Sequence, residues 1–346
     1  GEITRSDAWT WAILDLLAQV KFLTLFALLF GAGLQLLLRR GTRWIQSRLT
    51  LLVIFGFIHG LLFWDGDILL AYGLVGLICW RLIRDAHSVK SLFNTGVMLY
   101  VMGVGVLVLL GMISGEATNR SWIPDAANLQ YEQYWKLKGG TEAISNRADM
   151  LGDNLLALGA QYGWQLAGMM LMGASLMRTG WLKGEFSLRH YRLVGAGLLL
   201  LGILINLPAV MLQWHLHWNY RWCAFLLQAP RELSAPFQTI GYAALIYGFW
   251  PQICRLWLVS AIACVGRMAL SNYILQTLIC TTLFYQFGLF MKFDRFTLLA
   301  FVIPVWVVNV AFSVIWLRYF RQGPLEWGWR QLTSHASGVS LTNTSR

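Results

Sequence analysis

The chain has 346 residues, of which 57% are hydrophobic and 12% are charged, and its formal net charge is +11. The charged share is about half that of an ordinary globular domain, and a soluble core of this size could not bury so much apolar surface. Basic residues lie between apolar runs and form no single patch, which argues against a nucleic-acid partner. Five cysteines without CxxC spacing favour neither a disulfide framework nor a zinc site. The composition therefore indicates a polytopic, all-α membrane protein whose partner is the lipid bilayer.

Mostly apolar runs near the length that a helix needs to cross a bilayer, about 20 residues, recur along the chain. They are expected at 20–38, 48–64, 67–81, 94–114, 154–177, 191–213, 233–250, 256–287 and 297–317. The second and third runs are short, and the turn Trp64-Asp65-Gly66-Asp67 between them predicts a helical hairpin. The eighth run is too long for one straight helix, and Gly266-Arg267 predicts a break within it. The sequence thus predicts a bundle of about nine spans.

Basic residues follow every odd-numbered run, and cytoplasmic loops are the ones that retain Lys and Arg. The C-terminus is therefore expected to be cytoplasmic and residue 1 to lie on the outer face, with one further span before it. Around the membrane parts 20–114 and 154–320, three other segments are expected. These are an interfacial amphipathic segment at 1–19, an outer loop at 115–153, and a cytoplasmic tail at 321–346 that is disordered after Trp329.

His59 is the first candidate for chemistry, because ionisable residues at bilayer depth are costly and often functional. It precedes the outer end of the second run, and the following turn carries Asp65 and Asp67. An imidazole within reach of a carboxylate can act as a general base with an orienting acid. Alternatively, His59 bonds a backbone carbonyl at the hairpin while the two aspartates cap the third helix.

Arg231 and Glu232 lie between Pro230 and Pro236 at the head of the seventh run. Two prolines six residues apart predict a broken helix, and irregular backbone at membrane depth is tolerated only when it is buried in protein or lines a cavity. In such a place Arg231 would bind an anion such as a phosphate or a carboxylate. At the outer surface, the same segment would only be a loop.

Two polar stripes lie on different runs. Gln161 and Gln165 share one face of the fifth run, and Asn272 and Gln276 share one face of the eighth, shortly after Arg267. They predict a shared hydrated cavity or, alternatively, hydrogen bonds between helices without a cavity. Small residues predict close helix contacts. These are Gly31, Gly33, Gly103, Gly105, Gly168 and Gly173.

Three blocks of sequence carry a family resemblance: residues 21–33 (KFLTLFALLFGAG), His59-Gly60 followed by 66–73 (GDILLAYG), and 266–273 (GRMALSNY). Together they resemble the YeiB-like family of bacterial inner-membrane proteins, its enterobacterial members above all, and the similarity covers nearly the whole chain. The resemblance implies an inner-membrane bundle of about ten helices, with residue 1 periplasmic. It also implies a remote relation to transmembrane acyltransferases, including the lysosomal enzyme that acetylates the glucosamine of heparan sulfate.

The resemblance implies that an acyl group passes from acyl-CoA, such as acetyl-CoA, to a small-molecule or glycan acceptor, without a resident cofactor or metal. His59, oriented by Asp65 or Asp67, would be the base. Substrate would be bound by Arg231, Glu232, Arg267, Asn272, Gln276, Gln161 and Gln165. The chain lacks the family's Asp-x-x-Arg-Gly block and a histidine near Trp9 that would match the lysosomal enzyme. Alternatives are a transporter of a small anionic solute and a non-catalytic lipid-binding protein, and a homodimer is expected from its frequency alone.

Overall fold

The computed structural model describes residues 21–62, 69–113, 155–215, 228–281 and 295–339, with a few isolated positions besides. The predicted interfacial segment at 1–19, the turn with Asp65 and Asp67, and most of the 115–153 loop lie outside the described residues. Within the described ranges the regular structure is helical and no strand occurs. This confirms the prediction of an all-α fold.

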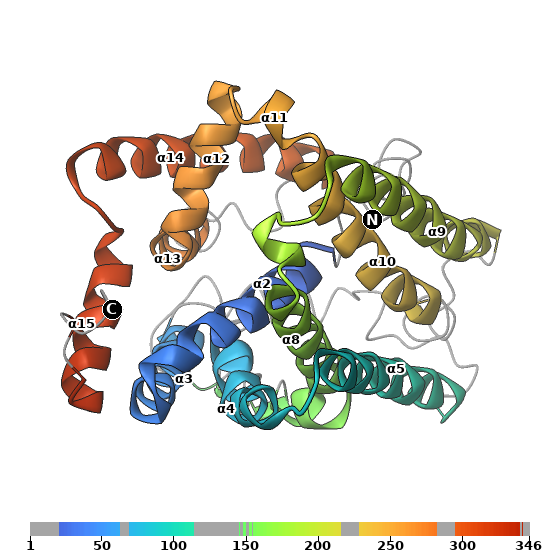
Figure 1. The fold of residues 1–346 in the computed structure, drawn as a ribbon, viewed down its shortest axis with the longest axis horizontal. Helices are drawn as coiled ribbons and strands as arrows, with labels where there is room; N and C mark the ends of the chain where they lie inside the picture. Colours follow the sequence, from blue (N-terminus) through green and yellow to red (C-terminus); the bar gives the residue numbers. More distant parts are fainter. Residues whose placement is uncertain are drawn as a thin grey trace.

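The described helices follow the predicted apolar runs (Figure 1). Their bounds are α2 Lys21–Leu37, η1 Leu38–Arg40, α3 Thr42–Leu62, α4 Leu69–Asp85, α5 Val89–Ile113, η2 Leu158–Tyr162, α8 Gly163–Arg178, η3 Trp181–Lys183, α9 Leu188–His215, α10 Gln228–Gly248, α11 Trp250–Ile253, α12 Trp257–Arg267, α13 Ala269–Thr281, α14 Arg295–Tyr319 and α15 Pro324–Ser337. Each of the nine predicted runs overlaps a helix.

Four stretches of the described helices are long and apolar enough to cross a membrane. They are Leu23–Arg40, Thr42–Leu61, Val89–Leu110 and Leu188–Pro208. The bent pair α12–α13 would make a fifth span, and Pro304–Tyr319 is a shorter apolar helix. The chain is thus a membrane protein, and the number of nine crossings stays a prediction.

Two of these helices leave apolar side chains on the outside of the bundle. Along α5, Val101 and Ile113 are more than half exposed, and along α9 the same holds for Leu193, Leu200 and Met211. Many exposed large apolar side chains on one helix are unusual for a soluble protein but are what lipid covers in a membrane. These outer faces therefore fit a hydrocarbon environment.

The centre of the bundle is the contact between α2 and α8, which requires glycine. A Cβ added to Gly31 would lie 1.9 Å from the carbonyl oxygen of Met170, and one added to Gly173 would lie 1.8 Å from that of Leu28. Only a residue without a side chain permits the backbones to approach so closely. The prediction of close packing is confirmed at these two positions, whereas Gly33 faces open space.

Three helix ends meet at Arg178, the last residue of α8. Its Nε donates to Gln35 of α2 at 3.0 Å, and its Nη2 donates to the carbonyl of Ile83 near the end of α4 at 2.5 Å. A guanidinium at a helix C-terminus satisfies carbonyls that have no intrahelical donor and interacts favourably with the helix dipole. Arg178 thereby ties the corresponding ends of α2, α4 and α8 together.

The expected break between Pro230 and Pro236 is wrong, because α10 runs through both prolines. Pro230 lies in the first turn, where an amide would have no intrahelical acceptor. Pro236 lies inside the helix and cannot donate to the carbonyl of Glu232, four residues earlier. The hydroxyl of Tyr100, on α5, donates to that carbonyl instead. A neighbouring helix thus supplies the donor that proline removes, and α10 stays continuous.

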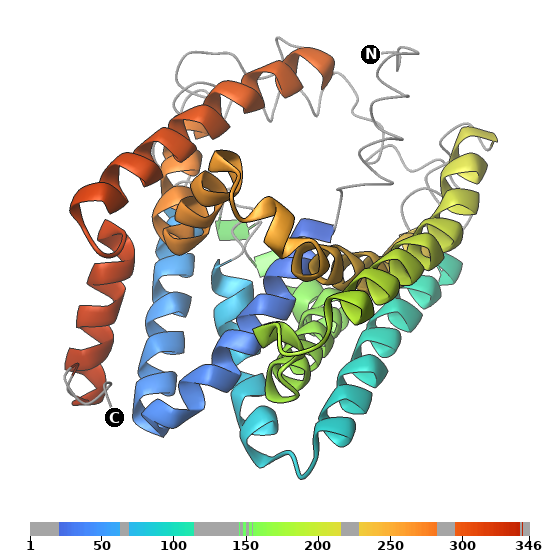
Figure 2. The same ribbon diagram turned by 45° about the horizontal axis from the view of Figure 1, so that its top comes forward.

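The expected disorder after Trp329 is also wrong, because α15 continues to Ser337 and ends at Gly338, whose φ of 71° is left-handed. The helix packs along α3 (Figures 1 and 2). Trp329 donates from Nε1 to the carbonyl of Arg48 at 2.9 Å, and Thr333 is fully buried. Polar composition suggested disorder, but the apolar face of this helix is covered by α3.

Candidate functional site

A chain of polar side chains connects α5, η2–α8 and α10. Gln161 donates from Nε2 to Oε1 of Gln165 at 2.8 Å and to the carbonyl of Gly103 at 3.3 Å. Gln165, which is buried, donates from Nε2 to Oε2 of Glu232 at 3.2 Å. We call Gln161, Gln165 and Glu232 the amide–carboxylate chain. The structure thus brings together candidates from two separate regions of the sequence.

The local backbone around this chain is irregular on one side. Gln161 lies in η2, a single π-helical turn, and such turns often occur at functional sites. On the other side, Glu232 follows Arg231, which is 6% exposed and whose carbonyl accepts the hydroxyl of Ser234 at 2.7 Å. A buried arginine next to a glutamate is unusual in a membrane protein and is a candidate for a binding site.

Tyr100 belongs to this site, although sequence reasoning did not select it. Its hydroxyl donates to the carbonyl of Glu232, so it holds the backbone that carries this half-buried carboxylate. The signal in the sequence was Pro236, which leaves that carbonyl without its helical donor. Hydropathy could not identify the replacement, because Tyr100 lies 132 residues away.

The second group of candidates surrounds a sharp bend. Between α12 and α13 the chain turns by 86° at Met268, which confirms the break predicted next to Gly266-Arg267. Asn272 closes the end of α12 by donating from Nδ2 to the carbonyls of Val265 at 3.2 Å and Met268 at 3.0 Å. The same nitrogen lies 2.7 Å from Oγ of Ser313 on α14. Asn272 therefore holds the bend in place.

A carboxylate of α15 caps the first turn of α13. Glu326 accepts the backbone amide of Ser271 at 2.9 Å and also its hydroxyl. A carboxylate at the first turn satisfies an amide without a helical partner and interacts favourably with the helix dipole. Arg267 is exposed and donates from Nη2 to the carbonyl of Arg321 at 2.8 Å, and Gln276 is exposed. Hence Asn272 and Gln276 differ in burial despite their shared face.

His59 lies beside this bend. It is 4% exposed, and its ring centroid is 5.2 Å from that of Tyr273, the residue after Asn272, with the rings tilted by 46°. The imidazole is thus held against α13, within the bundle. The proposed orienting residues Asp65 and Asp67 lie outside the described residues. The structure brings His59 next to the 266–273 block. The amide–carboxylate chain instead connects α8 to α5 and α10.

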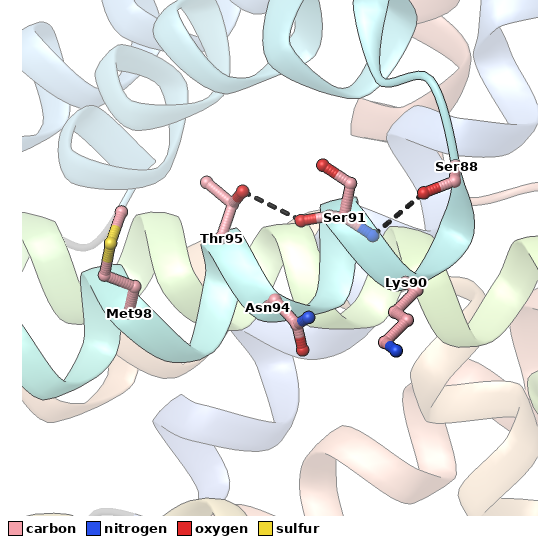
Figure 3. Close-up of a pocket in the computed structure, with 6 residues that line it drawn as sticks. All are labelled: Ser88, Lys90, Ser91, Asn94, Thr95 and Met98. Carbon is pink, nitrogen blue, oxygen red and sulfur yellow. Dashed lines mark hydrogen bonds between the residues drawn. The ribbon is translucent and has the colours of Figure 1, made fainter.

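A surface groove of about 450 Å³ lies elsewhere, on one face of α5 (Figure 3). Two of its hydroxyl groups bond to the backbone of the same helix. The Ser88 hydroxyl accepts the amide of Ser91 at 3.1 Å as an N-cap, and Thr95 donates to the carbonyl of Ser91 at 2.8 Å. A groove lined by the residues of one helix and its N-cap is a weak candidate for a site.

Comparison with known proteins identifies one matching family and relatives that align with nearly the whole chain. Residues 176–336 match the family described as "Protein of unknown function (DUF418)". The whole chain is 76% identical to the "Uncharacterized protein YeiB" of Escherichia coli (strain K12) and covers 90% of it. It is 28% identical to the "Uncharacterized protein YxaH" of Bacillus subtilis (strain 168), over 94% of this chain and 84% of that protein. No solved structure matches the chain.

Proposed function

Because the chain belongs to the YeiB family of membrane proteins, we propose that it is a transmembrane acyltransferase with His59 as general base. The donor would be an acyl-CoA such as acetyl-CoA, and the acceptor a hydroxyl or an amine. The observation that carries the proposal is the position of His59, which is almost fully buried within α3 and packed against Tyr273 beside the α12–α13 bend. Buried ionisable groups at membrane depth are functional candidates by default.

The proposed reaction requires a general base in a site from which water is excluded. The acceptor loses its proton to the His59 imidazole while its oxygen or nitrogen attacks the thioester carbonyl carbon. The new bond forms as the bond from carbon to sulfur breaks, and the His59 imidazolium returns the proton to the CoA thiolate as it leaves. Packing of the imidazole on the Tyr273 ring favours one ring orientation, and Asp65 or Asp67 would favour one tautomer.

The orientation in the membrane is part of the same proposal. Arg178 gathers the ends of α2, α4 and α8, and these ends precede loops rich in Lys and Arg. Under the positive-inside rule that face would be cytoplasmic, in a bacterial inner membrane, with residue 1 in the periplasm. Labelling of single cysteines introduced at Arg43 and at Thr118 with an impermeant maleimide tests it. Labelling of the Arg43 position in intact spheroplasts would show that this position faces the periplasm, and would contradict the proposed orientation.

Release of CoA thiol tests the enzyme directly. The full-length protein in nanodiscs is incubated with acetyl-CoA and a cell-envelope extract as the acceptor source. His59→Ala should abolish thiol release, and imidazole added to the buffer should restore part of it. His87→Ala is the matched control, since His87 is exposed in the turn between α4 and α5. Thermal stability with acetyl-CoA measures binding separately, because a ligand of the folded state raises the melting temperature.

These two measurements separate binding from chemistry. Retained acetyl-CoA stabilisation with lost turnover in His59→Ala supports a base. Equal turnover in His59→Ala and the native chain removes His59 from the mechanism. The absence of both stabilisation and thiol release, with every acyl-CoA from acetyl to palmitoyl, would reject acyl transfer.

Transport of a small anionic solute is a second candidate, favoured by the amide–carboxylate chain and the buried Arg231 beside it. Charged residues inside a bundle commonly line solute paths. Counterflow of labelled carboxylates and phosphates into proteoliposomes tests this function. Uptake that Arg231→Gln abolishes and His59→Ala leaves intact would favour transport over acyl transfer.

A further inference from the structure

Three arginines meet in a cavity that the proposed acyl-transfer site does not include. Arg40 at the end of η1, Arg48 in α3 and Arg330 in α15 line a pocket of about 220 Å³. Its remaining lining residues are Leu37, Trp44, Gln322, Glu326 and Trp329. We call this cavity the arginine pocket. Arg40 and Arg48 lie near the adjoining ends of two apolar stretches, so the pocket lies near one boundary of the hydrocarbon.

Aromatic rings hold two of the guanidinium groups. The Arg48 guanidinium carbon lies 3.8 Å from the ring centroid of Trp329, and that of Arg40 lies 4.8 Å from the ring centroid of Trp44. Trp329 is fixed in turn by its bond to the Arg48 carbonyl. A guanidinium that lies over an aromatic ring keeps its N–H edge free to bind a ligand in the guanidinium plane. The pocket is therefore preorganised rather than formed by mobile surface side chains.

The positive charges of the pocket are not balanced within the described residues. No ion pair joins Arg40, Arg48 or Arg330 to an acidic side chain there. The buried Nε atoms of Arg40 and Arg330, and the buried Nε1 of Trp44, have no acceptor among the described residues. By contrast, Arg178 and Arg192 of this chain donate to carbonyls at helix ends. Donors of this kind are expensive to leave without an acceptor once they are shielded from water.

The one carboxylate in the lining has another role. Both oxygens of Glu326 accept hydrogen bonds from Ser271, where they close the first turn of α13. Even when Glu326 is counted in full, three arginines and one glutamate leave two positive charges in the described lining. A phosphate monoester carries a charge of about −1.5 to −2 at neutral pH, whereas a lipid phosphodiester, like a carboxylate, carries one. Arginine forks also match phosphate oxygens in pairs.

We propose that the arginine pocket binds a phosphoryl group, held between Arg40, Arg48 and Arg330. The ligand could be the headgroup phosphate of an anionic lipid, since basic pockets between membrane helices suit such groups, or a soluble phosphate ester entering from the aqueous side. The chemistry of recognition is the same for both sources. The proposal does not depend on acyl transfer, because it uses none of the residues assigned to that reaction.

Binding is measured on the full-length chain with two probes. Inorganic pyrophosphate is titrated against the detergent-purified protein at constant ionic strength, with sodium chloride as the salt control, while thermal unfolding is followed. In parallel, the protein is placed in phosphatidylcholine nanodiscs with or without phosphatidylglycerol, and retained lipid is identified by native mass spectrometry. Arg330→Gln and Arg40→Gln are compared with Arg39→Gln and Arg43→Gln, whose side chains are exposed and do not line the pocket.

Arg330→Gln should weaken binding of the effective probe about tenfold or more, the range expected for a lost charge-assisted hydrogen bond, and the controls should bind as the native chain does. Without ligand, Arg330→Gln should melt at an equal or higher temperature, since repulsion between the arginines falls. If Arg330→Gln loses binding of pyrophosphate only, the ligand is a soluble phosphate ester. If it loses binding of phosphatidylglycerol only, the ligand is a lipid. Binding that is absent from the native chain, or equal in Arg330→Gln, Arg40→Gln and the controls, overturns the proposal.

Discussion

The bond from the Tyr100 hydroxyl to the Glu232 carbonyl should be coupled to Pro236. In Tyr100→Phe this carbonyl loses its donor, because proline provides no amide four residues later. In Pro236→Ala an amide returns and can donate to the same carbonyl within α10. The replacement of Tyr100 should therefore be costly when Pro236 is present and nearly harmless when it is absent.

The expected size follows from the position of the carbonyl. Leaving a buried acceptor unsatisfied costs about 1–3 kcal/mol of the free energy of unfolding. Hydrogen bonds between membrane helices average only about 0.6 kcal/mol and reach about 1.7, because the unfolded chain also finds partners within the membrane. Since the Glu232 carbonyl has lost its helical donor to Pro236, we expect a value towards the upper end. Tyr100→Phe should cost about 1–2 kcal/mol, and Pro236→Ala should recover most of it.

A double-mutant cycle measures this coupling in mixed micelles of detergent and dodecyl sulfate, with unfolding followed by tryptophan fluorescence. Pro208→Ala is the matched control, since Pro208 lies inside α9 and should not couple to Tyr100. Independent sites add within about 0.3–0.5 kcal/mol. If Tyr100→Phe and Pro236→Ala add within that limit, the hydroxyl does not replace the missing amide, and the explanation of the continuous α10 is refuted.

Three further predictions concern helix packing and capping. Gly173→Ala should destabilise the α2–α8 contact by about 1–3 kcal/mol through overpacking, whereas Gly33→Ala, which meets open space, should change little in the same unfolding assay. Glu326→Ala should cost about 1 kcal/mol by uncapping α13, and Glu326→Gln, which keeps an acceptor for Ser271, should cost less. Asn272→Leu should loosen the α12–α13 bend, seen as faster amide hydrogen exchange in α13 with little change in α5.

Local composition determined which segments are helical. Hydropathy runs predict α2, α5 and α9 because each needs only its own apolar residues to be stable in lipid. The break at Met268 could also be predicted, since a run of this length exceeds the membrane thickness and contains Gly266-Arg267. The polar stripe that contains Asn272 could also be predicted from the sequence. Its role in capping the end of α12 could not, because that role depends on the bend between α12 and α13.

Tertiary structure decided which polar groups meet, because partners are chosen by helix packing and not by neighbours in sequence. Tyr100 donates a hydrogen bond to a carbonyl that lies 132 residues away in the sequence. Trp329 bonds to Arg48 across 281 residues, and this contact helps to hold α15 where composition suggested disorder. The sequence alone determined that the chain is an all-helical membrane protein, since every backbone group in lipid must be paired within a helix. Only the packed bundle decided that His59 lies against Tyr273 and that Arg40, Arg48 and Arg330 share a pocket, since each set comes from helices far apart in the chain.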